Sequence, residues 1–480
     1  MMTLGKVRTL KKEEKDLDRI ENIEDYRDSL VYKTARKFYV ERIFSEMGQD
    51  ELAEKIGTKK SSISRFESGR QNVSLNYIEQ LAKAMKKDVN VVLSDVKVDY
   101  YGNNTDYVLK IYDEDLIKFS LFRDGLVSCK INWINEDKRQ LFPIDLEISE
   151  YGLLKWISSR TVPSNREYVE ELLYTLGISK ADLKGYIDVS MGLSLTDSYW
   201  IIPENSNRLF SEYNLFENRF TEALSLLAFT GWGYNGDNFI SSPELTTNGS
   251  LRKGWRIDFK GNRWLYKGGT DGFANTGLEP YSEFLASQVA EKMQLKSVKY
   301  EIENWKGVLS SKCKLFTDIN TSFIPIGSIV KTGGIDGVIK YYKELGEDFY
   351  QDLASMLVFD AVILNEDRHF GNFGLLRDNK TGKILGTAPI FDNGISLLCY
   401  AMKIDFDNGI EKYILNRSNP YSFDNQFIPL AKKVMGHRQK EELRRLINFK
   451  FTENNVANLP TWRIEALEKI IQDRVKLLLE

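Results

Sequence analysis

Residues 365–372 read NEDRHFGN, and residues 389–394 read PIFDNG. In the first stretch Asp367 is followed five residues later by Asn372, and in the second Asp392 ends an apolar Ile-Phe-Asp. In a loop of this spacing the first Asp orients an attacking hydroxyl, while the Asn and the second Asp hold Mg²⁺. Phosphoryl transfer requires little covalent chemistry from the protein, and these three side chains supply its minimum. The pattern therefore predicts Asp367, Asn372 and Asp392 as catalytic residues, with Asn372 and Asp392 as the metal ligands.

The flanks of these stretches favour that interpretation. Residues 356–364 are apolar and predict a helix that runs into the loop, and residues 373–376 predict a short strand after it. A turn at 378–382 and a return strand from 383 would bring Asp392 back beside Asn372. The alternative is a solvated surface loop in which an Asp and an Asn happen to lie five residues apart. The apolar flanks and the second Asp argue against that alternative.

The composition is that of an ordinary soluble protein, and it excludes several classes. The chain has 480 residues, 42% hydrophobic and 28% charged, with a net charge of −3. It has no apolar run long enough for a transmembrane helix, and its charged start is unlike a secretory signal. The three cysteines are far apart and there are only two histidines. We therefore expect a cytoplasmic protein without a zinc site, and nucleic-acid binding only through a local patch.

The order of elements predicts an α+β chain in which an all-α domain precedes a mixed body. Residues 1–33 form a charged lead-in, and residues 34–96 have the pattern of a bundle of short helices. Residues 97–205 mix strands and helices, including paired strands near 107–111 and 116–122. We expect one catalytic unit over residues 206–480, with nucleotide-binding elements at 240–295 and a helical lobe at 296–480.

A helix-turn-helix pattern lies in the all-α domain. Leu52 and Ile56 share one helix face, the small Ala53 allows a second helix to cross closely, and Gly57 supplies the turn between them. In the second helix Ile63 and Phe66 face the core. This region resembles the helix-turn-helix of the phage-repressor-like (XRE) family. The resemblance implies DNA contacts from the outward side chains, with Gln49 on phosphate and the second helix in the major groove. These side chains are Gln49, Lys59, Lys60, Ser61, Ser62, Ser64 and Arg65. A bundle used only for dimerisation is the alternative, because the patch is only mildly basic.

A candidate nucleotide-binding region precedes the catalytic stretch. Residues 246–253 read TTNGSLRK, and a hairpin is predicted from strands at 255–259 and 263–267. Lys267 ends the second strand, where kinases place the lysine that holds the α- and β-phosphates of ATP. Glu283 lies in the first turn of the following helix and is its predicted partner. An exposed strand-end lysine and an ordinary helix-start carboxylate are the alternatives for these two residues.

Together these residues resemble a HipA-type Ser/Thr kinase, the toxin of a bacterial toxin–antitoxin pair, over roughly residues 100–450. The resemblance implies a two-lobed protein-kinase-like fold that uses ATP and Mg²⁺, and a loop of the form Ser-x-x-Gly-x-x-x-Lys that covers ATP. Thr246 replaces that Ser here, and Gly249, Ser250 and Lys253 fall in the rest of the loop. The family's loop switches the enzyme off when it is autophosphorylated, which makes Thr246 and Thr247 candidate sites.

The resemblance also implies partners. A helix-turn-helix like that of the separate HipA antitoxin is fused to the body, so we expect a homodimer that binds duplex operator DNA. The family phosphorylates proteins such as aminoacyl-tRNA synthetases, but no residue here identifies a target. Two other functions remain open: a transcription factor with an inactive kinase-like sensor, and a small-molecule phosphotransferase. Residues 193–200 read LSLTDSYW, for which we predict a buried packing segment first and substrate docking second.

Overall fold

The computed structural model describes residues 47–87, Val89 and scattered positions between 31 and 45. It also describes residues 106–480 except 125, 177, 179–181, 221, 232–241, 271–276, 418 and 424. The charged lead-in at 1–33 therefore lies outside the described residues except for Val31. The chain forms a smaller unit up to Tyr100 and a larger unit that begins at Tyr101.

The smaller unit is helical. Its labelled helices are α4 (Gln49–Lys55), α5 (Lys60–Glu67) and α6 (Leu75–Ala84). Gly57 and Gly69 follow α4 and α5 with φ of +68° and +75°, the left-handed conformation that glycine adopts without strain. Phe66 is buried and meets the rings of Phe38 and Tyr77 edge-on. The expected helix-turn-helix geometry is therefore present, with Ile63 also buried.

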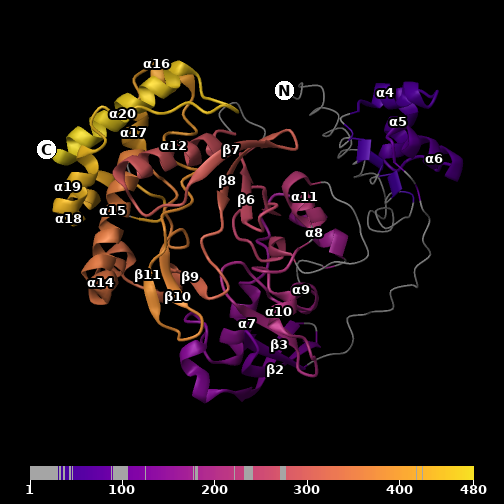
Figure 1. The fold of residues 1–480 in the computed structure, drawn as a ribbon, viewed down its shortest axis with the longest axis horizontal. Helices are drawn as coiled ribbons and strands as arrows, with labels where there is room; N and C mark the ends of the chain where they lie inside the picture. Colours follow the sequence, from indigo (N-terminus) through magenta and orange to yellow (C-terminus); the bar gives the residue numbers. More distant parts are fainter. Residues whose placement is uncertain are drawn as a thin grey trace. The chain divides into compact units, whose positions relative to one another are not determined.

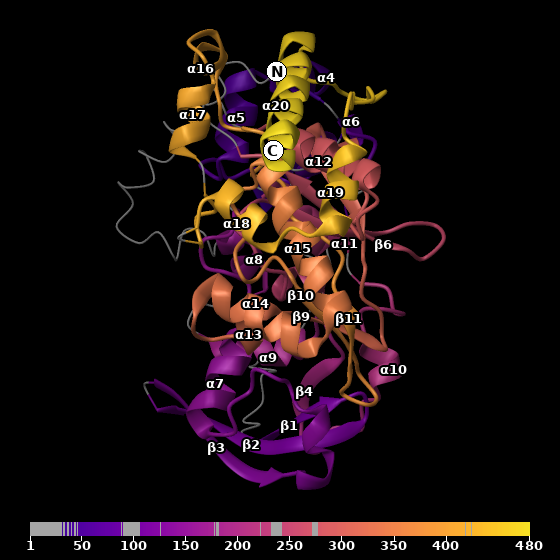
Figure 2. The same cartoon turned by 90° about the vertical axis from the view of Figure 1, so that its left-hand side faces the viewer.

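The larger unit begins with a four-stranded antiparallel sheet, which lies at one end of that unit (Figure 2). The strand order is β3-β2-β1-β4. The strands are β1 (Asp106–Ile111), β2 (Glu114–Asp124), β3 (Leu126–Ile134) and β4 (Tyr199–Pro203). The helices inserted before β4 are η1 (Glu136–Leu141), α7 (Glu150–Ser158), α8 (Val169–Leu176) and α9 (Leu183–Ser190). The predicted pairing of strands near 107–111 and 116–122 is confirmed as β1 with β2.

A second antiparallel sheet has the strand order β5-β6-β8-β7, and α12 packs against β7 and β8. Figure 1 shows β7 and β8 beside α12. The elements of this region are α10 (Phe210–Tyr213), α11 (Glu222–Thr230), η2 (Pro243–Leu245), β5 (Lys253–Ile257), β6 (Arg263–Gly268), α12 (Glu279–Met293), β7 (Tyr300–Trp305) and β8 (Val308–Lys314). The predicted hairpin is present, but the strand expected at 255–259 was misplaced by two residues. It begins at Lys253, because the ladder with β6 starts at the pair Lys253 and Lys267.

A third sheet and a group of helices complete the larger unit. The sheet contains β9 (Thr321–Pro325), β10 (Gly374–Asp378) and β11 (Ile384–Thr387) in the order β11-β10-β9. The helices are α13 (Ile326–Ile329), α14 (Gly334–Leu345), α15 (Glu347–Ile363), α16 (Lys403–Asp407), α17 (Glu411–Asn416), α18 (Phe427–Val434), α19 (His437–Arg444) and α20 (Thr461–Leu479). The hairpin of β10 and β11 is the one predicted from the turn at 378–382.

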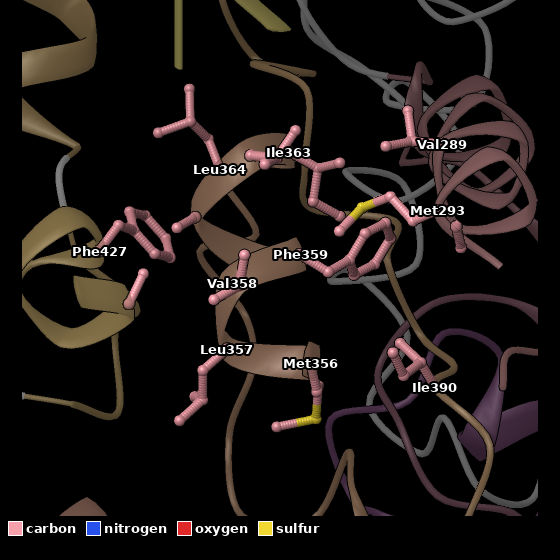
Figure 3. Packing of buried hydrophobic residues seen from close by; sticks show 14 of the residues in the cluster. Val289, Met293, Met356, Leu357, Val358, Phe359, Ile363, Leu364, Ile390 and Phe427 are labelled. Carbon is pink, nitrogen blue, oxygen red and sulfur yellow. The ribbon is translucent and has the colours of Figure 1, made fainter. Parts of the chain in front are cut away.

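Helix α15 positions the catalytic stretch, because it is buried over its whole second half. Its apolar residues are packed on several sides, which explains why residues 356–364 lack a polar face. Phe359 lies toward Val289 and Met293 of α12, and Phe427 of α18 lies on the other side of α15 (Figure 3). The NEDRHFGN stretch thus starts from a rigid element. Among the described residues, the helices lack a segment of the length and apolarity needed to cross a membrane.

Candidate active site

Lys267, Glu283 and Asp392 form a charge cluster contributed by three distant parts of the chain, in which Lys267 and Glu283 are buried and Asp392 is half-buried. Strand β6 carries Lys267, α12 carries Glu283, and Asp392 follows β11. Lys267 Nζ donates to Glu283 Oε1 at 2.8 Å and to Asp392 Oδ1 at 2.7 Å. Burial alone would lower the pKa of Lys267, but the carboxylates of Asp392 and Glu283 raise it well above its ordinary value. Lys267 therefore remains a cation inside the site.

The backbone of Asp392 is held in an unusual conformation. Its φ is +58°, a left-handed value that is uncommon for residues other than glycine, although Asp adopts it more readily than most. Its N–H donates to the Tyr300 hydroxyl at 3.0 Å, and the next N–H, of Asn393, donates to Glu283 Oε2 at 2.8 Å. Burial would raise the pKa of Asp392, but Lys267 and Lys253 hold it below its ordinary value. Tyr300 was not identified from the sequence, because a strand tyrosine has no pattern that separates it from core aromatics.

Arg368 ties the two catalytic stretches together and is fully buried. Its Nε and Nη2 donate to the two carboxylate oxygens of Asp360 on α15 at 2.9 and 3.0 Å. Its Nη1 donates to the carbonyls of Asn372 and Phe391, and its Nη2 also donates to Asn393 Oδ1. One guanidinium thus fixes residues on both sides of the site. Sequence reasoning missed this role, although an Asp inside an otherwise apolar helix was a usable signal.

Asp367 and Asn372 are joined directly. Asn372 Nδ2 donates to the Asp367 carbonyl at 3.1 Å, which leaves Asn372 Oδ1 as a ligand atom. An ionised carboxylate and an amide oxygen are hard donors that suit Mg²⁺, so Asp392 and Asn372 fit the predicted ion. Burial raises the pKa of the Asp367 carboxyl. A raised pKa makes this carboxylate a better proton acceptor than a solvated Asp.

All the predicted catalytic and nucleotide-contacting side chains line one cavity of about 880 Å³. They come from three loops, one strand pair and one helix. The lining includes Thr246, Thr247, Gly249, Ser250, Lys253, Lys267, Glu283, Asp367, Asn372 and Asp392. The cavity is therefore large enough to take a nucleotide-sized ligand beside these groups.

The loop at 246–253 lines part of this cavity. Gly249 has a φ of +101°, a backbone conformation that residues with a Cβ rarely adopt, so glycine is favoured at this position. Lys253 Nζ donates to the Asn248 carbonyl at 2.9 Å, and burial lowers the pKa of Lys253 to about 8. Ser250 is exposed, in contrast to its neighbours at the start of the loop.

The predicted phosphorylation sites are both engaged in hydrogen bonds. Thr246 is buried, and its Oγ1 donates to the Leu193 carbonyl at 2.7 Å. Thr247 Oγ1 donates to Pro243 O and accepts from Trp255 Nε1. The contact at Leu193 belongs to the segment 193–200, whose prediction as buried packing is confirmed for Leu193, Leu195 and Trp200.

Some of the side chains predicted to contact DNA are exposed at the surface of the helix-turn-helix unit. Lys59, Lys60, Ser61 and Arg65 are exposed, and Ser62 and Ser64 are half-buried. Lys60 Nζ forms an exposed ion pair with Asp50 at 2.7 Å. Gln49, the predicted phosphate contact, donates its Nε2 hydrogen to Glu67 Oε2 at 2.7 Å. Glu67 is itself buried and bound by Arg42.

Comparison with known proteins identifies the small unit. Residues 47–92 match the helix-turn-helix family. No curated protein matches the sequence. A chain of the Shewanella oneidensis MR-1 complex of HipA, HipB and operator DNA is similar at 12% identity and a TM-score of 0.46, covering 77% of this chain and 96% of that chain. The Helicobacter pylori proinflammatory kinase CtkA is similar at 17% identity and a TM-score of 0.36, covering 47% of this chain and 92% of that chain. Residues 47–92 therefore form a helix-turn-helix domain.

Proposed function

We propose that the chain is an ATP- and Mg²⁺-dependent protein serine/threonine kinase of the HipA type with a fused DNA-binding domain. The observation that carries the proposal is the gathering of Lys267, Glu283 and Asp392 in one cavity with Asp367 and Asn372. A cation paired to a helix carboxylate, an ionised Asp and an Asp–Asn loop are the parts that phosphoryl transfer from ATP requires. A sensor that only bound a ligand would not need Asp367 beside the metal-binding pair.

Each residue has a defined task in this mechanism. Lys267, kept charged and oriented by Glu283, binds phosphate oxygens of ATP, and Lys253 provides a second cation beside the loop. Asp367 accepts the proton of the substrate hydroxyl and aims its oxygen at the γ-phosphorus. Asn372 and Asp392 would hold Mg²⁺, which when bound offsets the negative charge of the phosphates. Arg368 keeps the Asn372 and Phe391 carbonyls in place and thereby positions both ligand residues.

Phosphate transfer from γ-labelled ATP tests this function. The full chain is incubated with labelled ATP and Mg²⁺, alone and with a cytoplasmic extract, beside the Asp367→Ala variant. Label on protein hydroxyls that depends on Asp367 supports the proposal. Label that appears only on small molecules supports the phosphotransferase alternative. Absence of transfer under every condition, with ATP still bound, supports the inactive sensor instead.

The helix-turn-helix domain supports a second part of the proposal, which is binding to duplex operator DNA. Exposed Lys59, Ser61 and Arg65 on and before α5 lie where such domains reach base edges and phosphates. A homodimer on a palindromic site in the chain's own upstream region is the expected complex. The protein phosphorylated by the larger unit belongs to the same proposal, with an aminoacyl-tRNA synthetase as the first candidate to test.

A further inference from the structure

Arg166 precedes α8, and its side chain is completely buried against the loop at 246–253 that lines the cavity. Its Nη1 donates to the Thr247 carbonyl at 3.2 Å, and its Nη2 donates to the Lys253 carbonyl at 2.8 Å. These two carbonyls lie at opposite ends of the residues 247–253. One planar guanidinium therefore joins the start and the end of the loop.

The guanidinium is itself fixed by a buried carboxylate. Glu244 lies in η2, immediately before the loop, and its Oε2 accepts from Arg166 Nη2 at 3.3 Å. Its Oε1 accepts from Ser225 Oγ and from the Trp255 N–H, each at 2.7 Å. Both side chains of the Arg166–Glu244 pair have no exposed surface. A buried ion pair with this many hydrogen bonds is costly to break from one side.

The next residue holds the middle of the loop. The Glu167 N–H donates to the Ser250 carbonyl at 2.9 Å, and the Glu167 carboxylate accepts from Arg252 at 2.9 Å. Leu245, just before the loop, is buried in a cluster with Leu172 and Leu173 of α8. The exposed part of the loop, including Ser250, is therefore held by an element far away in sequence.

We infer that Arg166 is a positioning residue that joins the two ends of residues 247–253, the nucleotide loop, and keeps Gly249, Ser250 and Lys253 at the cavity. We call this bridge from Arg166 to the Thr247 and Lys253 carbonyls the staple. The inference rests on the proposed function, since it assigns to the loop the role of covering ATP. Arg166 acts through the Thr247 and Lys253 carbonyls, and it does not line the cavity. Without the staple the loop loses its fixed conformation, and ATP binding must supply the free energy of ordering it.

Hydrogen exchange of the nucleotide-free full chain tests the staple directly. Arg166→Lys keeps a charge opposite Glu244, but an ammonium lacks the planar fork that reaches both carbonyls. We expect the amides of residues 247–253 to exchange at least about tenfold faster in this variant. Arg474→Lys is the matched control, because Arg474 is also a buried arginine and donates to the Ala361 carbonyl in the helical core. Unchanged loop exchange in folded Arg166→Lys overturns the inference.

A second variant covers the case in which Arg166→Lys does not fold. Arg166→Met combined with Glu244→Gln removes both charges, so no charge is left buried without a partner. The same faster loop exchange is expected in this pair, and unchanged exchange overturns the inference equally.

A kinetic measurement links the staple to ATP. The KM for ATP should rise about tenfold in either variant, with kcat at saturating ATP close to that of the wild type. A fall in kcat with an unchanged KM contradicts a role in holding the nucleotide loop. If wild-type protein binds no ATP, the proposed function fails, while the exchange experiment still reports on the staple.

Discussion

Lys253 and Lys267 lie directly opposite each other on β5 and β6, and both side chains reach the same cavity. Two buried cations on neighbouring strands repel one another, so an anion is needed between them for both to remain charged at low cost. Their neighbourhoods differ, since Lys267 Nζ donates to two carboxylates, whereas Lys253 Nζ donates to the Asn248 carbonyl. This difference makes Lys253 the group that titrates.

ATP affinity should fall as the pH rises through about 8, where burial places the pKa of Lys253. Below that pH the ammonium is protonated and attracts phosphate, and above it the neutral amine does not. Lys267 stays charged across this range because its pKa is raised. Titration calorimetry with ATP at several pH values measures the trend. Lys253→Arg should bind ATP equally at all of them, and a wild-type affinity that does not change with pH contradicts the assignment.

Asp367→Ala should abolish phosphoryl transfer and leave ATP binding largely intact, because this carboxylate acts on the nucleophile. The loss of a nucleophile-orienting group costs about 10²-fold or more in rate. Asp392→Ala should also weaken binding of Mg²⁺-ATP, since it removes a metal ligand. Single-turnover rates and calorimetry separate the two effects. Asp407→Ala, on the exposed α16, is the control. A rate for Asp367→Ala within about tenfold of the wild-type rate contradicts the assignment of Asp367 as the group that orients the nucleophile.

Thr246 should be the principal autophosphorylation site, with Thr247 and Ser250 modified less. Its hydroxyl donates to the Leu193 carbonyl, and a phosphate at that position carries no proton to donate and repels the carbonyl oxygen. Modification should therefore release the start of the loop and lower ATP affinity. Phosphopeptide mapping after incubation with ATP identifies the sites. Phosphate found only outside residues 241–253 refutes the loop switch.

Sequence-specific DNA binding should depend on Ser62 and Arg65 of α5. Replacing both with alanine should relax preference for the upstream site more than it lowers affinity for random DNA, because base contacts carry specificity. The few basic groups predict a salt slope of roughly 4 to 6 per dimer in log–log terms. Fluorescence anisotropy on both DNAs measures this, with Lys83→Ala on α6 as the control. A double variant that retains full preference places recognition elsewhere in the chain.

Asp360→Ala should destabilise the larger unit strongly, because it leaves the fully buried Arg368 without its carboxylate. Breaking a buried ion pair from one side costs about 3–5 kcal/mol in the free energy of unfolding. Asp336→Ala is the control, since Asp336 and Lys433 form an exposed pair worth about 1 kcal/mol or less. Denaturant unfolding followed by circular dichroism compares the two. Equal effects from both substitutions would show that Arg368 does not hold the catalytic stretches together.

Much of the local structure follows from the sequence, for physical reasons that act over short distances. The apolar run at 356–364 predicts a helix that runs into the catalytic loop, and α15 is that helix, ending at Ile363. The turn at 378–382 predicts the hairpin of β10 and β11, and Gly57 marks the turn of the helix-turn-helix domain. Side-chain periodicity and the preference of glycine for positive φ determine these features, and both depend only on a few neighbouring residues in the sequence.

The tertiary structure alone decided how distant groups meet. Lys267 and Asp392 are separated by 125 positions, and their 2.7 Å contact depends on how the sheet that contains β6 packs with the sheet that contains β11. Tyr300, Arg368 and Arg166 gain their roles from buried hydrogen bonds to backbone atoms, which leave no mark on side-chain periodicity. The start of β5 at Lys253 is likewise a tertiary feature, because it is set by the pairing of Lys253 with Lys267 on β6.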